Sequence, residues 1–441
     1  MNTLTPSSKM SAPVYVVDGL RTPFLKAKGI GNFSASDLAT AAGKALINRL
    51  PISVNDVDEV ILGCAAPSAD EVNIARYVAL RLGGDNLTGY TVMRNCASGM
   101  QALDNACDRI NAGRAELVLA GGVDALSRTP LLYQEQMVQW FADMASKKTT
   151  LDKLKHFLRL SPSALLNPVI SLMRGLTDPK VGLLMGQTAE NLAARYHISR
   201  QQMDAYSAQS HLRAAQAIAN NVLRDEVTPL VDAKGNIYAN DDGVRKDSTP
   251  EALAKVKPFF DKPFGNVTAA NSSQVTDGAV WCLLASAEAV TQFNLPVLGM
   301  IVDSQWAGLD PAVMGLGPVY ASAPMLKRHG LKLNDLQHIE LNEAFAAQVL
   351  ACKAAFEDQA FCAQEFGQAD FGTLDLDKLN PDGGAVALGH PVGASGARIV
   401  LHTLNRMQEG DTGLATICIG GGQGGAMLLK KTSKIQAQES A

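Results

Sequence analysis

The chain has 441 residues, 47% of them hydrophobic and 19% charged, which is typical of a folded globular protein rather than a disordered chain. Its formal net charge of −4 indicates neither nucleic-acid binding nor general attachment to anionic membranes. The seven cysteines are an odd number with no C-x-x-C pair, which argues against a disulfide framework and a zinc site and for a reducing compartment.

At the start of the chain, residues 1–9 lack the apolar core of a signal peptide. No apolar run further along approaches the ~20 residues of a membrane-spanning helix. The sequence therefore predicts a cytoplasmic protein.

Helical segments then alternate with short apolar strands. A β-type run at 15–17 is followed by helical spacing over 38–50 and by a buried strand at 60–63. A second helix is predicted over 102–110, and an apolar strand at 117–122 closes in glycines. This alternation predicts an α/β fold built in layers.

The order of these segments recurs later in the chain. Ala97-Ser98-Gly99, a helix and a glycine-edged strand return as Ala394-Ser395-Gly396, a helix and a second such strand. Upstream, residues 55–62 resemble residues 334–341 in the same relative place. The shared order and spacing predict an internal duplication, in which two similar halves pack together and each gives a glycine-edged loop to one interface.

The middle of the chain breaks this pattern and reads as an insertion over the core. We expect one half at 12–122 with 266–292, the insertion at 123–265 and the other half at 293–432. Within the insertion, residues 154–176 combine leucines with basic side chains. We expect a helical lid packed on its own protein; the alternative is a basic amphipathic segment that lies on a membrane or binds a partner.

Two cysteines lie beside glycines, where backbone N–H groups can approach a substrate. Cys96 stands at a predicted strand-to-helix junction, where a helix N-terminus would lower the thiol pKa and offer donors to an oxyanion. Cys418 ends an apolar strand before three glycines, where a thiol could move a proton. The alternative for a free cysteine is a small buried hydrophobe. That alternative suits the cysteines in apolar or helical contexts: Cys107, Cys282, Cys352 and Cys362.

A histidine and an asparagine complete the candidate chemistry. His390 lies in a glycine-rich loop and is a candidate general base for a thiol, whereas His329, His338 and His402 read as structural. Asn342 follows a predicted strand, where its amide can orient a water or a carbonyl oxygen, cap a helix, or do both.

Four segments that contain these residues resemble the thiolase superfamily in order and spacing: NCASGMQA, NEAFA, GGAVALGHP and CIGGGQGG. The resemblance covers about residues 12–430. It implies a duplicated, five-layer αβαβα core with an inserted loop domain that binds CoA and the acyl chain, assembled into homodimers or homotetramers. It further implies coenzyme A (CoA) and acyl-CoA as substrates, with no permanently bound cofactor and no metal.

The resemblance also implies roles for individual residues. Cys96 is similar to the nucleophile that becomes acylated, His390 to the base that deprotonates it, and Cys418 to the acid/base that exchanges a proton with acetyl-CoA. A water held by Asn342, together with His390, would form one oxyanion hole, and the N–H groups of Cys96 and Gly420 the other. Two further positions fall where the family contacts CoA: Arg245 and Ser273.

The expected activity is reversible, CoA-dependent cleavage of 3-ketoacyl-CoA to acetyl-CoA and a shortened acyl-CoA. Leu184, where many short-chain members carry histidine, and the long 154–176 segment are closer to degradative thiolases of β-oxidation, including subunits of multienzyme complexes. Asn342 stands where those subunits often have histidine. Three alternatives remain: a biosynthetic acetoacetyl-CoA thiolase, a decarboxylating ketosynthase, which would not need Cys418, and a non-catalytic lipid- or CoA-binding protein.

Overall fold

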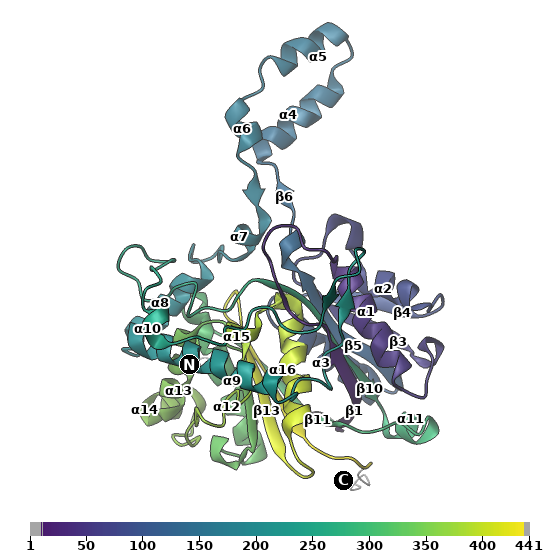
Figure 1. The fold of residues 1–441 in the computed structure, drawn as a ribbon, viewed down its shortest axis with the longest axis vertical. Helices are drawn as coiled ribbons and strands as arrows, with labels where there is room; N and C mark the ends of the chain where they lie inside the picture. Colours follow the sequence, from purple (N-terminus) through teal and green to yellow (C-terminus); the bar gives the residue numbers. More distant parts are fainter. Residues whose placement is uncertain (1–9, 11, 436–441) are drawn as a thin grey trace.

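The computed structural model describes residue 10 and residues 12–435, so the expectation about residues 1–9 lies outside the described residues. A layered body carries one long projection (Figure 1). Ten strands of the body form one sheet in the order β12-β13-β14-β11-β1-β10-β5-β3-β4, with β2 paired to β10. The predicted α/β class is confirmed.

The first half comprises the elements before the insertion and two that follow it, β10 and α11. Its elements are β1 (Val14–Arg21), β2 (Leu25–Lys26), α1 (Ala35–Asn48), β3 (Glu59–Gly63), α2 (Ile74–Leu82), β4 (Thr88–Val92), α3 (Ser98–Asn111), β5 (Leu117–Ala125), β10 (Thr276–Ala285) and α11 (Ala287–Gln292). Those of the second half are β11 (Gly299–Gly308), α12 (Gly317–His329), β12 (His338–Leu341), α13 (Ala346–Glu357), α14 (Gln359–Phe366), α15 (Ala385–Leu388), α16 (Val392–Arg406), β13 (Thr412–Ile419) and β14 (Gln423–Lys430).

The predicted duplication is confirmed down to irregularities of the strands. β3 runs parallel to β5, as β12 does to β13, and both β5 and β13 have an antiparallel neighbour, β10 and β14. The register shifts by one residue before Asp18 in β1 and before Asp303 in β11. Each of these aspartates accepts a hydrogen bond from the next backbone N–H, at 2.8 and 3.0 Å. The two halves therefore repeat a β-bulge as well as an order of elements.

The strands carry apolar side chains on both faces, so that helices cover the sheet on its outer and inner sides. This arrangement gives the five layers, αβαβα. Leu117 and Leu119 of β5 face α1 and α2, whereas Val118 faces the central helices α3 and α16. The strands of the second half do the same, with their outer face against α12 and α13. Because side chains alternate across a strand, one sheet serves an outer and an inner apolar core. The equivalent helices of the two halves thus meet in the middle of the molecule (Figure 1).

Glycines permit this central contact. A Cβ at Gly122 would overlap the carbonyl oxygen of Gly393, and one at Gly99 would lie 2.7 Å from the same oxygen. The first turns of α3 and α16 consequently approach with backbone against backbone. This contact brings together the two loops that precede these helices.

The insertion contains β6 (Leu131–Leu132), α4 (Glu135–Ser146), α5 (Thr150–Phe157), α6 (Pro162–Leu166), β7 (Val169–Ile170), α7 (Ser171–Gly175), α8 (Met185–Arg195), α9 (Arg200–Ala219), β8 (Leu230–Val231), β9 (Ile237–Tyr238) and α10 (Pro250–Leu253). From α8 onwards it packs on the body: α8 and α9 contact the second half, and the β8–β9 hairpin contacts the first half. The part before α8 does not, because α4, α5 and α6 stand away from the body on the β6–β7 ribbon (Figure 1).

The expectation of a lid over 154–176 is therefore wrong. This segment ends α5, forms α6 and α7, and breaks between them at Pro162 and Pro168. Proline cannot continue a helix from the preceding turn, so one long amphipathic helix does not form. Within the described part of the chain, no helix is both long and apolar enough to cross a bilayer.

Candidate functional site

Cys96 lies in a tight turn between β4 and α3, as the sequence predicts. Asn95 adopts a positive φ of 44°, and the Ser98 hydroxyl donates to the Asn95 carbonyl at 2.7 Å. The same hydroxyl accepts the Arg94 backbone N–H at 2.9 Å. The half-buried Cys96 is thereby held at the N-terminus of α3, over the glycine contact with α16.

The pKa of the Cys96 thiol is shifted in the direction opposite to the one expected from the sequence. Burial raises this pKa, and the charge of Asp124 adds to the increase. The backbone N–H groups of Gly420 and of Cys96 itself hydrogen-bond to the sulfur and lower the pKa, as a helix N-terminus was expected to do, but the effect of burial is larger. Both predicted oxyanion-hole donors therefore point at the atom expected to attack.

Cys418 comes from the other half, at the end of β13. It is buried, and its pKa is raised well above the usual value by burial and then by the charge of Cys96, so the two thiols lie close enough to interact. The following turn is tied to the Cys96 loop, because the Asn95 side-chain amide donates to the Gly420 carbonyl at 2.8 Å. Gly421 has a φ of 94°, a conformation that favours glycine at this turn.

His390 lies two residues before α16 and is buried. Its backbone N–H donates to the Gln274 carbonyl at 2.9 Å, and its Nδ1 lies 2.6 Å from the Ser395 hydroxyl. That hydroxyl donates its only proton to the Pro391 carbonyl at 3.0 Å. It must therefore accept a proton from Nδ1, so Nε2 carries the free lone pair.

The environment keeps this imidazole neutral. Burial, with the charge of Arg398, lowers the pKa of His390 to about 4. Nε2 is buried and has no hydrogen-bond partner in the described part of the protein. A neutral ring with an unpartnered acceptor nitrogen is the form that a general base requires.

Asn342 follows β12 and is fully buried. Neither its amide nitrogen nor its amide oxygen has a partner among the described residues, although buried polar atoms in proteins are normally hydrogen-bonded. It does not cap α13, which begins at Ala346 with Phe345 as its N-cap. Of the two interpretations left open by the sequence, the N-cap is wrong.

The loop around Gln274 connects the His390 segment with the positions predicted to contact CoA. The Gln274 side-chain amide donates to the carbonyls of Gly243 and Val386, at 3.0 and 3.1 Å. Next to it, the Ser273 N–H donates to the Ala344 carbonyl at 2.9 Å, two residues beyond Asn342. Ser273 is thus adjacent to the site.

Arg245 lies two residues beyond Gly243 and is half-buried. Its N–H donates to His211 Nδ1 at 3.2 Å. Burial, together with the charges of Arg245 and Lys26, lowers the pKa of His211 to about 4. Two cations therefore share this corner with a neutral histidine.

Two buried carboxylates that no sequence motif singled out position these loops. Glu343 accepts from the hydroxyls of Tyr206 and Ser210, both at 2.7 Å, and from the Asn380 amide at 3.0 Å. It fixes the turn that carries Asn342. The sequence does show a carboxylate within an apolar segment, which signals a buried acid. Its hydrogen-bond partners could not be predicted, because they lie far away along the chain.

Asp124 is the second of these carboxylates. It accepts from the N–H groups of Ala66 and Gly393, at 2.9 and 2.5 Å, and from the Cys64 thiol at 3.3 Å. Burial raises its pKa to about 6. Asp124 fastens the first turn of α16, and hence the His390 loop, to the first half.

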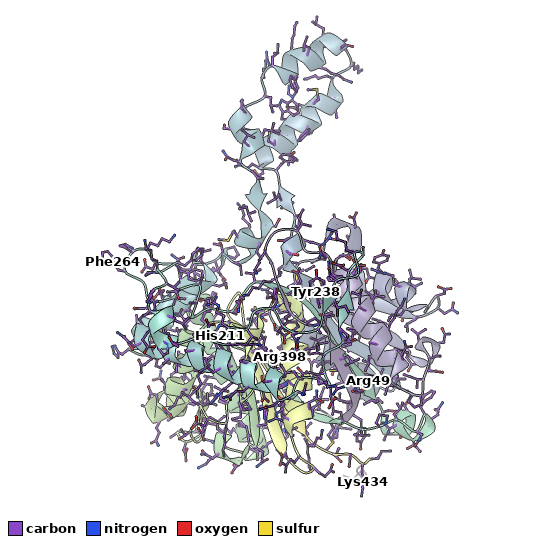
Figure 2. All side chains as sticks on the ribbon, viewed as in Figure 1. Arg49, His211, Tyr238, Phe264, Arg398 and Lys434 are labelled. Atoms are coloured by element: carbon purple, nitrogen blue, oxygen red, sulfur yellow. The ribbon has the colours of Figure 1, made fainter. Side chains whose placement is uncertain are left out.

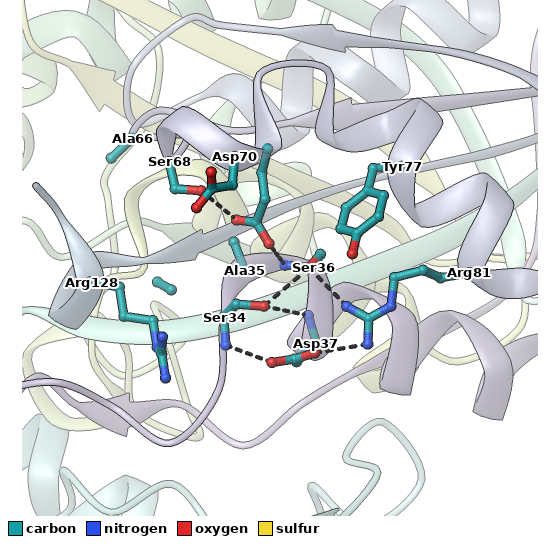
Figure 3. A pocket seen from close by; sticks show the side chains of 12 residues that line it. Ser34, Ala35, Ser36, Asp37, Ala66, Ser68, Asp70, Tyr77, Arg81 and Arg128 are labelled. Atoms are coloured by element: carbon teal, nitrogen blue, oxygen red, sulfur yellow. Dashed lines mark hydrogen bonds and ion pairs between the residues drawn. The ribbon is translucent and has the colours of Figure 1, made fainter.

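A polar cavity of about 560 Å³ elsewhere on the first half does not belong to this site (Figure 3). Its charges are largely satisfied internally: Arg81 pairs with Asp37 at 2.8 Å, and Glu71 accepts the Ser36 N–H at 3.0 Å. None of the predicted site residues lines it. Over the described ranges, no three His, Cys, Asp or Glu side chains gather as a metal site would require.

Comparisons with known proteins agree with the fold. The family models described as "Thiolase, N-terminal domain" and "Thiolase, C-terminal domain" match residues 14–288 and 295–431. A 3-ketoacyl-CoA thiolase of Yersinia enterocolitica is 36% identical over 424 residues, 95% of this chain and 96% of the relative. The crystal structure of human mitochondrial 3-ketoacyl-CoA thiolase in complex with CoA is 35% identical, with a TM-score of 0.82 over 97% of this chain and 100% of that one. Acat5 thiolase from Ascaris suum in complex with CoA has a TM-score of 0.80 at 29% identity, over 95% of this chain and 100% of that one.

Proposed function

The chain belongs to the thiolase family, is an acyltransferase of that family, and from this premise we propose that it cleaves 3-ketoacyl-CoA with CoA as acyl acceptor in fatty-acid β-oxidation. The products are acetyl-CoA and an acyl-CoA shortened by two carbons, and the reaction is reversible. The observation that carries the proposal is the meeting of the two cysteine loops, where the side-chain amide of Asn95, next to Cys96, donates to the carbonyl of Gly420, two residues after Cys418, at 2.8 Å.

Cleavage begins when His390 Nε2 takes the proton of the Cys96 thiol. The sulfur attacks the 3-keto carbon, the C2–C3 bond breaks, and its electron pair leaves as the enolate of acetyl-CoA. Cys418 gives that carbanion its proton. Cys418, now a thiolate, takes the proton of a second CoA thiol. The CoA thiolate attacks the acyl-Cys96 thioester, acyl-CoA leaves, and the Cys96 sulfur regains its proton from His390.

Two sets of donors stabilise the negative oxygens in turn. The N–H groups of Cys96 and Gly420 serve the oxyanion on the carbon attached to Cys96. Asn342, through a water, and His390 serve the enolate oxygen of acetyl-CoA; the unpartnered amide of Asn342 supports this assignment. The neutral resting states of Cys96, Cys418 and His390 suit this order of steps, because negative charge on the substrate then develops only as the carbonyl is attacked.

Arg245 and Ser273 are proposed to contact CoA. Arg245 and Lys26 both lie near His211, and two neighbouring cations support an anion-binding corner. The phosphate groups of CoA carry the negative charge that such a corner binds. The proposed units are residues 12–122 with 266–292, the CoA- and acyl-binding insertion 123–265, and residues 293–432. Met185 supplies part of an apolar wall, because a Cβ at Gly420 would lie 3.2 Å from the Met185 sulfur.

The proposal includes a cytoplasmic homodimer or homotetramer. β4 is an edge strand of the large sheet, and Tyr77 and Met93 beside it are exposed apolar side chains. An edge of this kind is a template for pairing with a second copy. The proposal also includes a contact of residues 154–176 with a multienzyme partner or a membrane. Exposed large apolar side chains extend beyond this segment, from Leu131 to Met173.

The test is the thiolysis rate across 3-ketoacyl-CoAs of four to sixteen carbons. We expect turnover, with Cys96→Ala reducing it to background. Full retention of activity in Cys96→Ala would refute the proposal. Malonyl-CoA as the required co-substrate would instead indicate the ketosynthase, and a Cys96 that iodoacetamide cannot label, without protection by acyl-CoA, would indicate the non-catalytic protein.

A further inference from the structure

The projection, here called the arm, comprises residues 131–175. Its base is the ribbon in which Leu131 pairs with Ile170 and Leu132 with Val169. Beyond the ribbon, α4, α5 and α6 extend into solvent, and Figure 2 shows their side chains pointing outwards around the whole arm. The arm therefore presents a free surface well away from the body.

A small core holds the arm together and leaves most of its apolar side chains outside. Trp140 stacks on His156, with ring centroids 5.2 Å apart, and His156 Nε2 lies 3.0 Å from the Trp140 carbonyl. Of α4, α5 and α6, only Met137 and Ala164 are buried. The few side chains that hold the arm together are thus different from its exposed apolar side chains, so the latter can be substituted without loss of the arm's core.

The exposed apolar side chains of the protein concentrate on the arm. Of the 25 large hydrophobic residues that are exposed among the described residues, 13 belong to it, although it is about a tenth of the chain. Leu158 and Leu166 are 76% and 75% exposed. The full set is Leu131, Leu132, Tyr133, Val138, Phe141, Leu151, Leu154, Phe157, Leu158, Leu165, Leu166, Ile170 and Met173. A concentration of this size marks an interaction surface rather than ordinary scatter.

The far end of the arm is also basic, in contrast to the protein as a whole. Between positions 147 and 159 there are five cations and one acid, whereas the chain carries a net charge of −4. The cations are Lys147, Lys148, Lys153, Lys155 and Arg159. None of them forms an ion pair within the described part of the chain. Their charge is therefore available to an external anion.

Helix α5 shows how the two features combine. At 100° per residue, Leu151, Leu154 and the C-cap Leu158 lie within a sector of about 60°, with Lys155 about 40° beyond one edge and Lys153 about 100° beyond the other. Lysine stems can lie along an apolar surface while their ammonium groups reach the polar layer. An apolar stripe bordered by cations is the pattern of a helix that lies in the interface of a membrane.

We propose that the arm binds peripherally to lipid membranes that carry anionic head groups. The apolar side chains of α5 and its neighbours enter the boundary between head groups and acyl chains, and the five cations contact the lipid phosphates. A lipid surface fits better than a protein partner, because the unpaired cations lie next to exposed apolar side chains, as anionic head groups lie next to acyl chains. This inference rests on the surface of the arm and not on the proposed catalytic activity.

The test is co-sedimentation of the full-length protein with vesicles. We expect binding to equimolar phosphatidylcholine and phosphatidylglycerol, weak binding to phosphatidylcholine alone, and weakening of the former by salt. Lys153→Gln and Lys155→Gln should each reduce the affinity about fivefold, and Leu154→Ser with Leu158→Ser at least tenfold.

Phe264→Ser is the matched control, since Phe264 is 90% exposed on a loop of the body (Figure 2) and its loss should leave vesicle binding unchanged. All these variants should retain thiolysis of acetoacetyl-CoA in solution, which separates this test from that of the activity. No binding to the anionic vesicles, or equal binding by the Leu154→Ser/Leu158→Ser variant, would overturn the proposal. A change of oligomeric state in that variant without any vesicle binding would assign the arm to protein contacts instead.

Discussion

The orientation of His390 by Ser395 leads to a specific prediction for Ser395→Ala. The substitution removes the hydroxyl that accepts the Nδ1 proton at 2.6 Å and donates to the Pro391 carbonyl at 3.0 Å. The buried ring then has two choices. It keeps a proton on Nδ1 without a partner, or it moves that proton to Nε2 and can no longer accept the proton of Cys96.

The size of the effect follows from the unpaired N–H. A buried donor left without an acceptor costs about 1–3 kcal/mol, and a tenfold change in rate corresponds to about 1.4 kcal/mol. We therefore expect kcat/KM for thiolysis to fall about 5- to 150-fold. The loss should stay below that of His390→Ala, because removal of a general base typically lowers the rate by about 10²- to 10⁴-fold.

The assay measures thiolysis of acetoacetyl-CoA and the rate of Cys96 alkylation by iodoacetamide, both as functions of pH. Ser395→Ala should lower both rates and change the pH profile, with the decrease in kcat rather than in CoA binding. Ser322→Ala is the control, because Ser322 is also buried and donates to the Thr416 hydroxyl at 3.2 Å, away from the imidazole. Wild-type rates in Ser395→Ala, or the same small decrease in both variants, would refute the reasoning.

Three further predictions concern the second thiol, a buried ion pair and the central glycines. Cys418→Ala should still form the acyl-enzyme but lose condensation of acetyl-CoA; unchanged condensation in a radiolabel assay would contradict the assigned role. Although burial lowers the pKa of His402, the Glu226 carboxylate, 2.8 Å away, raises it to about 10, so its contribution to stability is complete below about pH 6.5 and is lost as the pH rises towards 10. His402→Gln should therefore reduce the slope of the free energy of unfolding between pH 6.5 and 8.5 by up to about 1.4 kcal/mol per pH unit, as measured by urea denaturation, and an unchanged slope would be the contrary result. Gly122→Ala should destabilise the fold by about 1–3 kcal/mol because its Cβ would overlap the first turn of α16, whereas Gly308→Ala, also in a strand but with no atom within 4 Å, should be tolerated; equal melting temperatures would show that the helices can move apart.

Local patterns in the sequence were sufficient for much of the fold. The alternation of helices and apolar strands, and the repeat of Ala97-Ser98-Gly99 at 394–396, predict two equivalent α/β halves, and both are present. The repeat even extends to the serines: Ser98 holds a backbone N–H before α3, where Ser395 holds the His390 ring before α16. Such features are readable because periodicity and turn residues act over a few positions along the chain.

Other properties depend on contacts between residues far apart and could not be predicted. The pKa of Cys96 is raised because burial exceeds the effect of the backbone donors, and the amount of burial is known only once both halves have packed. The partners of Glu343 and Asp124 come from segments at least 37 residues away. The same holds for the arm: its apolar and basic side chains are evident in the sequence, but an amphipathic segment has the same pattern whether it covers its own protein or extends into solvent. Composition and motifs thus determined the chemistry and the duplicated plan, whereas tertiary packing decided the protonation states and the free surface, because desolvation and exposure are set by what lies around a side chain in space.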